Sequence, residues 1–345
     1  MKHGGGGRPQ GPALPGRRGT TPPPLRPIDL GRVRTYPLAG RHSKVAAAAL
    51  ARPPRPSMSL RRFLQTLPDI LGARDLRAVA QAIAACHRDG RLIVLGMGAH
   101  PIKVGLSPLI IDLMQRGIVT AVAMNGACII HDFELAFHGA TSEDVAASLT
   151  TGEFGMAEET GRFLNQAVTR GREAGLGSAV GRAILDAKLP HRQLSILAAG
   201  VRLGVPVTVH VAVGTDIIHM HPSADGAAIG AASLADFRRL ASVAQQLHRG
   251  VFINLGSAVI IPEVFLKALN LARNVGNRVG ELVTLDMDFT RHYRPAVNVV
   301  QRPTLGDGRG YQLTGHHEIM FPLLCAAVFD ALTARPARGR AAREP

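Results

Sequence analysis

Residues 91–126 read RLIVLGMGAHPIKVGLSPLIIDLMQRGIVTAVAMNG, and this stretch decides the fold class. Two apolar runs, 91–97 and 118–124, each end in a turn that contains glycine, and the segment 106–116 between them has apolar residues at helical spacing. Strands that are apolar throughout are typical of parallel sheets covered by helices on both faces. The stretch therefore predicts an α/β protein.

The same alternation continues toward the C-terminus. Three more apolar runs are expected to be strands: VPVTVHV at 205–211, GVFINLGSA at 250–258 and ELVTLDMDF at 281–289. Helices are expected at 60–90, 156–187 with glycine breaks, 233–248, 262–273 and 316–333. The sequence thus predicts a Rossmann-like, doubly wound fold with a mostly parallel sheet and helices on both faces.

The net charge of +15 lies almost wholly in two tails. Residues 1–57 hold 11 Lys and Arg against the single Asp29, together with 11 of the 23 prolines, and residues 331–345 hold four Arg against Glu344. The part between them carries about +2. We expect a disordered Pro/Gly/Arg-rich tail at 1–57, a single α/β domain at 58–334 and a basic tail at 335–345.

Composition excludes several classes of protein. A hydrophobic content of 46% supports a large core, but no apolar run reaches the roughly 18 residues of a membrane span. The chain has no Trp and no basic stripe interleaved with aromatic residues, so we expect no nucleic acid at its core. Three scattered cysteines, Cys86, Cys128 and Cys325, do not make a disulfide framework. We predict a cytoplasmic protein that does not bind membranes.

Glycine and polar residues gather where the predicted strands end. In open α/β sheets, ligands bind at the carboxyl ends of the strands, so residues from distant parts of the chain are expected to converge there. The glycine-rich turns, which suit the phosphates of a cofactor, give these cofactor-binding candidates: Gly96, Gly98, His100, Lys103, Asn125, Gly126, Gly256 and Ser257.

Histidines and acids at the same strand ends are the candidates for chemistry. Histidine suits proton transfer because its pKa lies near neutrality. His219 and His221 are two residues apart, so an extended segment would place them on one side. The catalytic candidates are His131, Asp132, Asp216, His219, His221, His316 and His317. The substrate-binding candidates, which would hold an amine if they face the cleft, are Asp216, Glu263, Asp286 and Asp288.

Four segments resemble the deoxyhypusine synthase family, in the same order along residues 65–334. They are LGMGAHPIKVGLSPLIIDLMQRGIVTAVAMNGACIIHD at 95–132, VPVTVHVAVGTDIIHMH at 205–221, GVFINLGSAVIIPEVFLKALNLARN at 250–274 and HHEIMFPLLCAAVF at 316–329. The resemblance implies the family's fold, an NAD cofactor, a small-molecule substrate and a homotetramer. It also matches Asp216 with the family's polyamine-binding aspartate and Asp132 with an acid of its second turn.

The chain departs from the family at the two residues that its chemistry needs most. The family's catalytic histidine falls at Pro262 or Glu263, and its nucleophilic lysine falls within 294–303, which contains no lysine. Arginine cannot replace that lysine because it does not deprotonate to form an imine. We therefore expect an NAD-binding transferase or lyase of this superfamily that does not make deoxyhypusine through a lysine imine.

Two alternatives stay open. One is a metal-dependent hydrolase or lyase in which His219, His221 and His316 act as ligands, although no metal is expected under the main hypothesis. The other is a catalytically silent nucleotide-binding protein that has kept the fold and lost the nucleophile.

Overall fold

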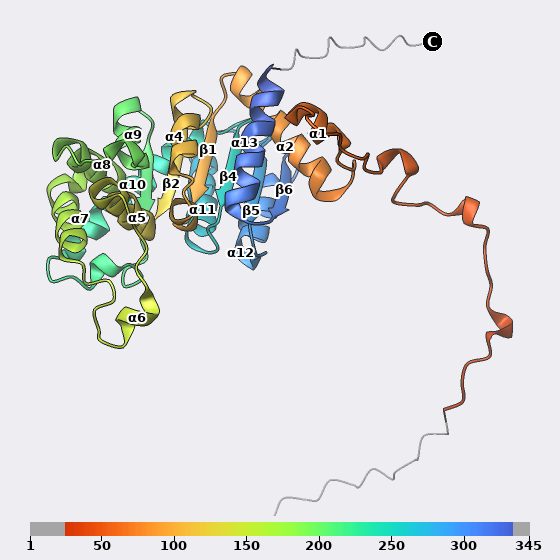
Figure 1. The fold of residues 1–345 in the computed structure, drawn as a ribbon, viewed down its shortest axis with the longest axis horizontal. Helices are drawn as coiled ribbons and strands as arrows, with labels where there is room; N and C mark the ends of the chain where they lie inside the picture. The colour runs from red at the N-terminus through yellow and green to blue at the C-terminus, as the bar shows by residue number, and fades with distance from the viewer. Residues whose placement is uncertain (1–24, 334–345) are drawn as a thin grey trace, which may run out of the picture. The chain divides into compact units, whose positions relative to one another are not determined.

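A computed structural model describes residues 25–333 (Figure 1). Residues 1–24 and the predicted tail at 335–345 lie outside the described residues. Contacts divide the chain into two units after Lys44. The described part of the first unit is exposed throughout and contains two short 3-10 turns, η1 (Leu30–Arg32) and η2 (Leu38–Gly40). The domain start expected at residue 58 stays a prediction; helix α1 (Leu60–Thr66) begins just after it.

The centre of the second unit is a six-stranded, all-parallel sheet in the order β3-β2-β1-β4-β5-β6. This arrangement confirms the predicted fold class and the five predicted strands. A sixth strand at the edge was not predicted. The strands are β1 (Ile93–Met97), β2 (Ala121–Asn125), β3 (Val207–His210), β4 (Val251–Leu255), β5 (Val283–Asp288) and β6 (Arg309–Thr314).

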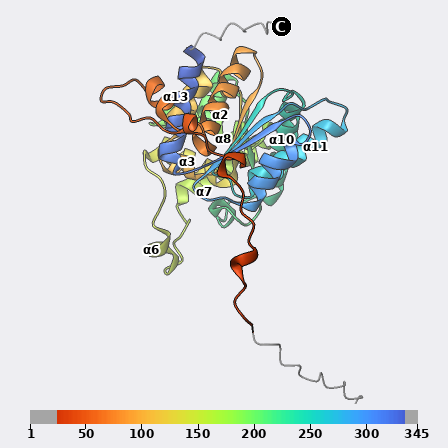
Figure 2. The same cartoon turned by 90° about the vertical axis from the view of Figure 1, so that its right-hand side faces the viewer.

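Helices cover both faces of the sheet. Figure 2 shows α2 and α13 to one side and α10 and α11 to the other. The longer helices are α2 (Leu71–Arg88), α4 (Ser107–Gln115), α5 (Gly126–His138), α7 (Glu158–Gly171), α8 (Leu176–Asp186), α9 (Ile196–Leu203), α10 (Gly226–Gln245), α11 (Ile260–Asn274) and α13 (His317–Thr333). The short segments are η3 (Ala47–Ala49), α3 (His100–Lys103), α6 (Val145–Leu149), η4 (Arg172–Ala174), η5 (Arg192–Leu194), η6 (Ile217–His219), α12 (Tyr293–Pro295), the π-helix η7 (Ala296–Gln301) and η8 (Arg302–Thr304).

Strand order creates a switch point between β1 and β4. The chain runs outward from β1 through β2 to β3, and then returns to place β4 on the other side of β1. The connections that follow β1 and β4 therefore diverge and leave a crevice at their carboxyl ends. Helix α6 lies away from the sheet, on an arm that projects between α5 and α7 (Figure 1).

Asp236 of α10 covers the outer edge of β3. Its buried carboxylate accepts hydrogen bonds from the Val209 amide of β3 and from the Gly177 amide of α8, both at 2.9 Å. Arg239 donates to the same carboxylate at 2.9 Å. The carboxylate thus joins three elements and occupies a donor that an edge strand would otherwise expose.

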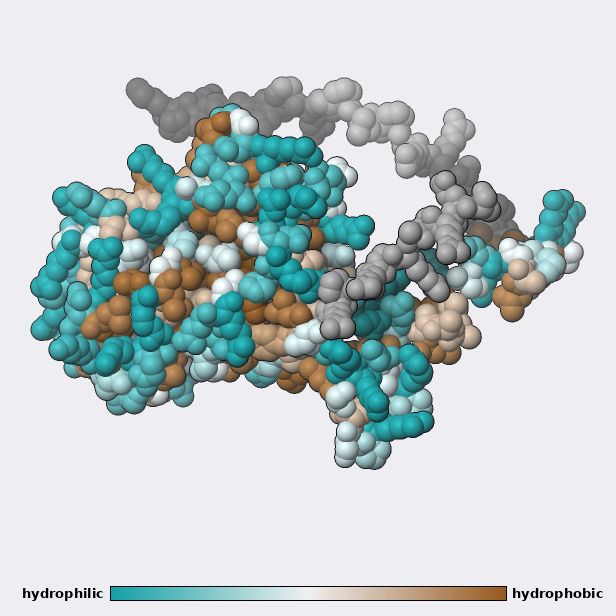
Figure 3. All heavy atoms as spheres, turned by 90° about the horizontal axis from the view of Figure 1, so that it is seen from above, coloured by the Kyte–Doolittle hydropathy of each residue, from teal (hydrophilic) through white to brown (hydrophobic). Residues whose placement is uncertain are grey.

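The surface mixes apolar and polar side chains. On the face seen in Figure 3, hydrophobic residues form patches among hydrophilic ones. Within residues 25–333, no helix is long and apolar enough to cross a membrane. All three cysteines are buried and free.

Candidate functional site

Backbone lines the switch-point crevice, because glycines from β1 and β4 meet there. A Cβ atom on Gly98 would lie 2.3 Å from the carbonyl oxygen of Gly256, and the Gly98 amide donates to Leu255 O at 3.1 Å. Gly98 therefore has no room for a side chain. Gly256 has none either, because a Cβ atom there would meet the His317 ring, and its φ of +66° disfavours other residues. The two turns therefore pack backbone on backbone, and the His317 ring fills the space beside Gly256.

Three aromatic rings and one acid surround this crevice; we call His100, Asp288, Phe289 and His317 the switch-point cluster. The ring centroids are 5.2 Å apart for His100 and His317, 5.5 Å for His100 and Phe289, and 5.8 Å for Phe289 and His317. The cluster brings together the end of β5 and the residues that follow β1 and β6, so three candidates from the sequence, His100, Asp288 and His317, lie side by side.

His317 is fully buried, and neither ring nitrogen has a hydrogen-bond partner within the described residues. Its Nε2 lies 3.5 Å from Oδ1 of Asp288, which already accepts from the Phe289 amide at 2.8 Å. Burial lowers the pKa of His317, so the ring is neutral at pH 7. A buried imidazole without partners is costly, and a polar ligand group that reaches it would remove that cost.

A second group of residues lines a cavity of about 240 Å³ beyond the ends of β2 and β3. We call it the Lys103 cavity. Its polar lining comes from Lys103, His131, Glu134, Ser142, Glu143, Thr215 and Asp216, and its apolar lining from Ala127, Ile130, Val145, Phe154 and Ile217. Since α3 carries His100 at one end and Lys103 at the other, one helical turn links the cavity to the switch-point cluster.

Asp216 is the buried acid of the cavity. The carboxylate is 7% exposed, and its Oδ2 has no hydrogen-bond partner among the described residues. It rests on the backbone of Gly126, where a Cβ atom would lie 1.9 Å from Oδ2. Burial raises the pKa of Asp216 to about 6. The glycine expected to bind a cofactor therefore makes room for this acid.

His131 presents a ring nitrogen with a free lone pair, because its other ring nitrogen is held in a hydrogen-bonded relay. The Thr141 hydroxyl donates to Oε2 of Glu134 at 2.5 Å, so its oxygen accepts the proton of His131 Nδ1 at 2.7 Å. The lone pair is then on Nε2. Burial, and then the charge of Lys103, lower the pKa of His131 to about 4. The ring is thus a neutral proton acceptor at pH 7.

Asp132 points away from His131, although the two are adjacent in sequence. Both lie on α5, where successive side chains diverge by about 100°. The buried Asp132 carboxylate accepts from the Ser195 hydroxyl and from the Ile196 amide at 2.7 Å, at the N-terminus of α9. It therefore anchors a helix rather than lining the cavity.

His219 and His221 do not share a side, and the expectation of an extended segment there was wrong. Residues 217–219 form the 3-10 turn η6, and Nδ1 of His219 accepts from the amides of Gly214 and Asp216. His221 packs on Gly161, and its Nε2 lies 3.1 Å from Glu158 Oε2. The two imidazoles thus diverge into separate contacts.

The remaining candidates lie outside both groups. Gly96 is packed so closely that a Cβ atom on it would lie 2.5 Å from the Ile261 side chain. The Ser257 hydroxyl oxygen accepts a hydrogen bond from the Ile261 amide in the first turn of α11. Glu263 pairs with Lys267 and Arg294. Asn125 accepts a hydrogen bond from the Cys128 thiol. Asp286 accepts from the side chains of Asn254 and Gln312 within the sheet. His316 is exposed and faces Glu318. His131, Asp216, His221 and His316, all within the described residues, make no hydrogen bond or ion pair with one another.

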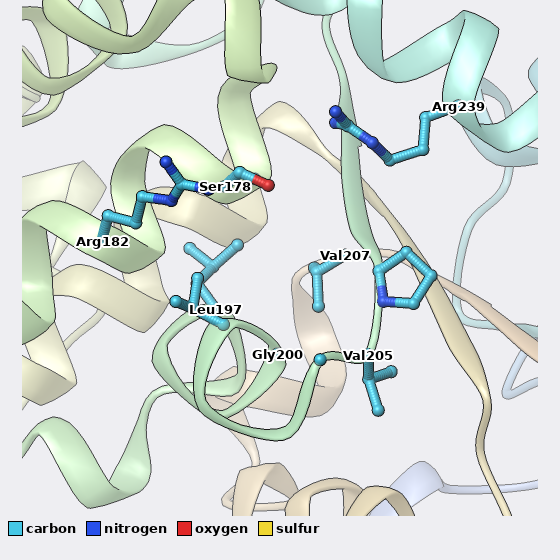
Figure 4. Close-up of a pocket in the computed structure, with 11 residues that line it drawn as sticks. Ser178, Arg182, Leu197, Gly200, Val205, Val207 and Arg239 are labelled. Atoms are coloured by element: carbon cyan, nitrogen blue, oxygen red, sulfur yellow. The ribbon is translucent and has the colours of Figure 1, made fainter.

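A separate hollow lies at the opposite, amino end of β3 (Figure 4). Arg182 and Arg239 approach it from α8 and α10. Arg239 is already bonded to Asp236 and to the carbonyl of Ala174 at 2.8 Å. We therefore assign this hollow to the packing of the sheet edge.

Sequence reasoning missed Glu134, Thr141 and Phe289. Glu134 follows His131 by three residues, so a helix prediction for 126–138 would have placed both on one face. Thr141 comes from the arm and carries no local signal. Among residues 25–333, no group of three or more His, Cys, Asp and Glu side chains could hold a metal ion.

The fold and these two groups define a doubly wound α/β protein with a polar rim. No protein-family model and no curated protein matches the chain. Solved structures similar to it include ArgZ, an arginine dihydrolase from the ornithine–ammonia cycle in cyanobacteria, at 16% identity over 75% of this chain and 32% of that one, with a TM-score of 0.47. This chain thus spans about a third of the length of ArgZ.

In two further similar structures, the match extends over a larger share of the other chain. A putative LOR/SDH protein from Methanococcus maripaludis S2 is 12% identical over 88% of this chain and 76% of that one, with a TM-score of 0.48. A putative deoxyhypusine synthase from Entamoeba histolytica is 11% identical over 79% and 94%, with a TM-score of 0.48.

Proposed function

We propose that this protein is an NAD-binding enzyme that acts on a small amine, with His131 as the base. The observation that carries the proposal is the contact of Gly98 with Gly256 at the switch point, beside the unpartnered imidazole of His317. This crevice is where open α/β sheets bind nucleotides. The resemblance of 95–132 to a nucleotide-binding unit of deoxyhypusine synthase supports the same cofactor.

The residues present fit a dinucleotide on two counts. Glycine at both turns keeps side chains out of the switch point, where Gly98 packs on Gly256, so a cofactor held beside these turns would face backbone groups. His317 supplies a buried ring nitrogen, and His100 and Phe289 supply ring faces for a planar group. His100, Gly98, Gly256 and His317 would hold the cofactor, which supplies a hydride acceptor when it is bound.

His131 and Asp216 supply the acid–base chemistry. Asp216, as a carboxylate, holds the amine of the substrate, and its burial strengthens that attraction. The Nε2 lone pair of His131 takes the proton that the amine loses when the carbon beside it gives up a hydride. Glu134 and Thr141 keep the accepting nitrogen free of its own proton.

Titration with NAD, followed by thermal denaturation, tests the cofactor. We expect the melting temperature to rise, since a ligand at 100 times its Kd stabilises the folded state by about 2.7 kcal/mol. His100→Ala is expected to weaken NAD binding at least tenfold. The control is His316→Ala, since His316 is exposed and adjacent in sequence to His317 of the switch-point cluster. An unchanged melting temperature at millimolar NAD would remove the cofactor from the proposal, and NAD binding without turnover of any amine would indicate a catalytically silent protein.

A further inference from the structure

We infer that the Lys103 cavity binds an aminocarboxylate, a small zwitterion with an amine at one end and a carboxylate at the other. This inference rests on the proposed function, because it names the substrate class of the same site. It comes from two opposite charges that line one cavity and are both without an ionic partner.

The acidic end of the cavity is Asp216. Its side chain is more than nine-tenths buried, its Oδ2 has no hydrogen-bond donor, and within residues 25–333 it forms no ion pair. A buried, unpaired carboxylate is costly in the free protein. An ammonium group is the ligand group that compensates it best.

The basic end is Lys103. It is the only lysine or arginine that lines the cavity within the described residues, and it forms no ion pair there. Lys103 is exposed, and no ion pair of 4.0 Å or less joins it to Asp216, so the two charges lie apart along one open cavity. A ligand carboxylate placed at Lys103 would give each charge its own counterion.

The other two acids of the lining are already engaged. Glu134 accepts from the hydroxyls of Thr141 and Thr160, and Oε1 of Glu143 accepts from the Gly155 amide at 2.9 Å. Hydrogen bonds from hydroxyls and an amide do not cancel the charges of these two acids, so Lys103 is what distinguishes the two ends of the cavity. A second ammonium at Lys103 would meet a like charge, whereas a carboxylate there would meet its counterion, and this local contrast favours a zwitterion over a diamine.

Size and wall chemistry limit the ligand. A cavity of about 240 Å³ lies below the roughly 300 to 1,000 Å³ of pockets that hold drug-sized ligands, so its ligand is small. Five apolar residues form the wall between the polar groups, which suits a short methylene chain. An ω-amino acid of about five carbons meets both limits.

The test compares ligands with the same five-carbon chain and different ends: 5-aminopentanoate, 1,5-diaminopentane, pentanedioate and pentylamine. Calorimetry is run on the full chain without NAD and with saturating NAD. We expect 5-aminopentanoate to bind at least tenfold more tightly than each of the other three. Tighter binding of diaminopentane or pentanedioate, or no binding of any of the four, overturns the inference.

Two variants test the charges separately. Lys103→Glu is expected to reverse the order, so that diaminopentane binds at least tenfold more tightly than 5-aminopentanoate; Lys188→Glu, outside the cavity, is the control for net charge. Asp216→Asn should weaken the binding of all three amines at least tenfold and leave the binding of pentanedioate unweakened. An unchanged order in Lys103→Glu overturns the inference. Failure of NAD to bind, with the ligand order as expected, would count against the proposed function alone.

Discussion

At the scale of single residues, two buried aspartates with similar pKa values differ in their hydrogen bonds. Burial raises the pKa of both Asp216 and Asp236 to about 6, but Asp236 has three donors and Asp216 Oδ2 has none. A buried carboxylate oxygen without a donor is retained at a cost in stability, which is typical of functional sites. The contrast marks Asp216 as the functional acid of the pair.

Asp216→Asn should therefore stabilise the protein, and only above pH 5. Because the folded pKa is raised from 3.8 to about 6, the stability that protonated Asp216 gives is lost as pH rises through this range. We expect a gain of about 1 to 2 kcal/mol at pH 8 and none at pH 4, measured by urea denaturation. Asp236→Asn, the control, should destabilise at pH 8, and a loss of stability in both variants would contradict the argument.

His131 should titrate far below an ordinary histidine. Its pKa is lowered to about 4 by burial and by the charge of Lys103, so NMR should find the neutral Nδ1–H tautomer throughout pH 5 to 8. Lys103→Met is expected to raise this pKa, and Thr141→Val to mix the tautomers, with Thr141→Ser as the control. A His131 pKa near 6.5 in the unmodified protein would mean that the ring is not enclosed as described.

At the scale of elements, glycine at the start of α5 is required by what packs on it. Gly126 and Gly226 are each the first residue of a helix, but a Cβ at Gly126 would lie 1.9 Å from Asp216, whereas nothing lies within 4 Å at Gly226. Gly126→Ala should cost about 1 to 3 kcal/mol, and Gly226→Ala should be neutral or stabilise by up to about 1 kcal/mol. Equal thermal shifts for the two variants would refute the close contact.

The elements were predictable where burial is complete on both faces. Strands β1 to β5 are buried along nearly their whole length and are rich in apolar residues, so the sequence predicts them directly. Strand β6, RGYQLT, lies at an edge, and only Leu313 in it is buried, so it lacks that pattern. Helix α5 was missed because Asn125-Gly126 reads as a turn, and this error hid the divergence of His131 from Asp132.

The candidate site was predictable only in part. Strand ends located His100, Lys103, His131, Asp216 and His317, because topology alone brings those ends to one edge. Topology could not show that His219 and His221 point elsewhere, because the direction of a side chain after a strand depends on the local turn. Thr141 depends on the path of the arm, which no periodicity encodes.

At the scale of the whole molecule, the basic N-terminal segment should be dispensable for folding. All described residues from 25 to 44 are exposed, and contacts place them in a unit separate from residue 45 onward. A chain beginning at Val45 is expected to melt within about 1 °C of the full chain, because none of the described residues that are removed, 25–44, is buried. Calorimetry checks this, and a drop of several degrees would assign the segment a structural role.

The carboxylate that closes the β3 edge also limits how copies of this chain can meet. Asp236 already occupies the Val209 amide, so an incoming strand cannot add to the sheet there without displacing a buried charge. Sheet extension from one molecule to the next is therefore blocked on that flank, which protects a parallel sheet from fibrillar growth. Self-association would have to proceed through helices or through the opposite flank at β6.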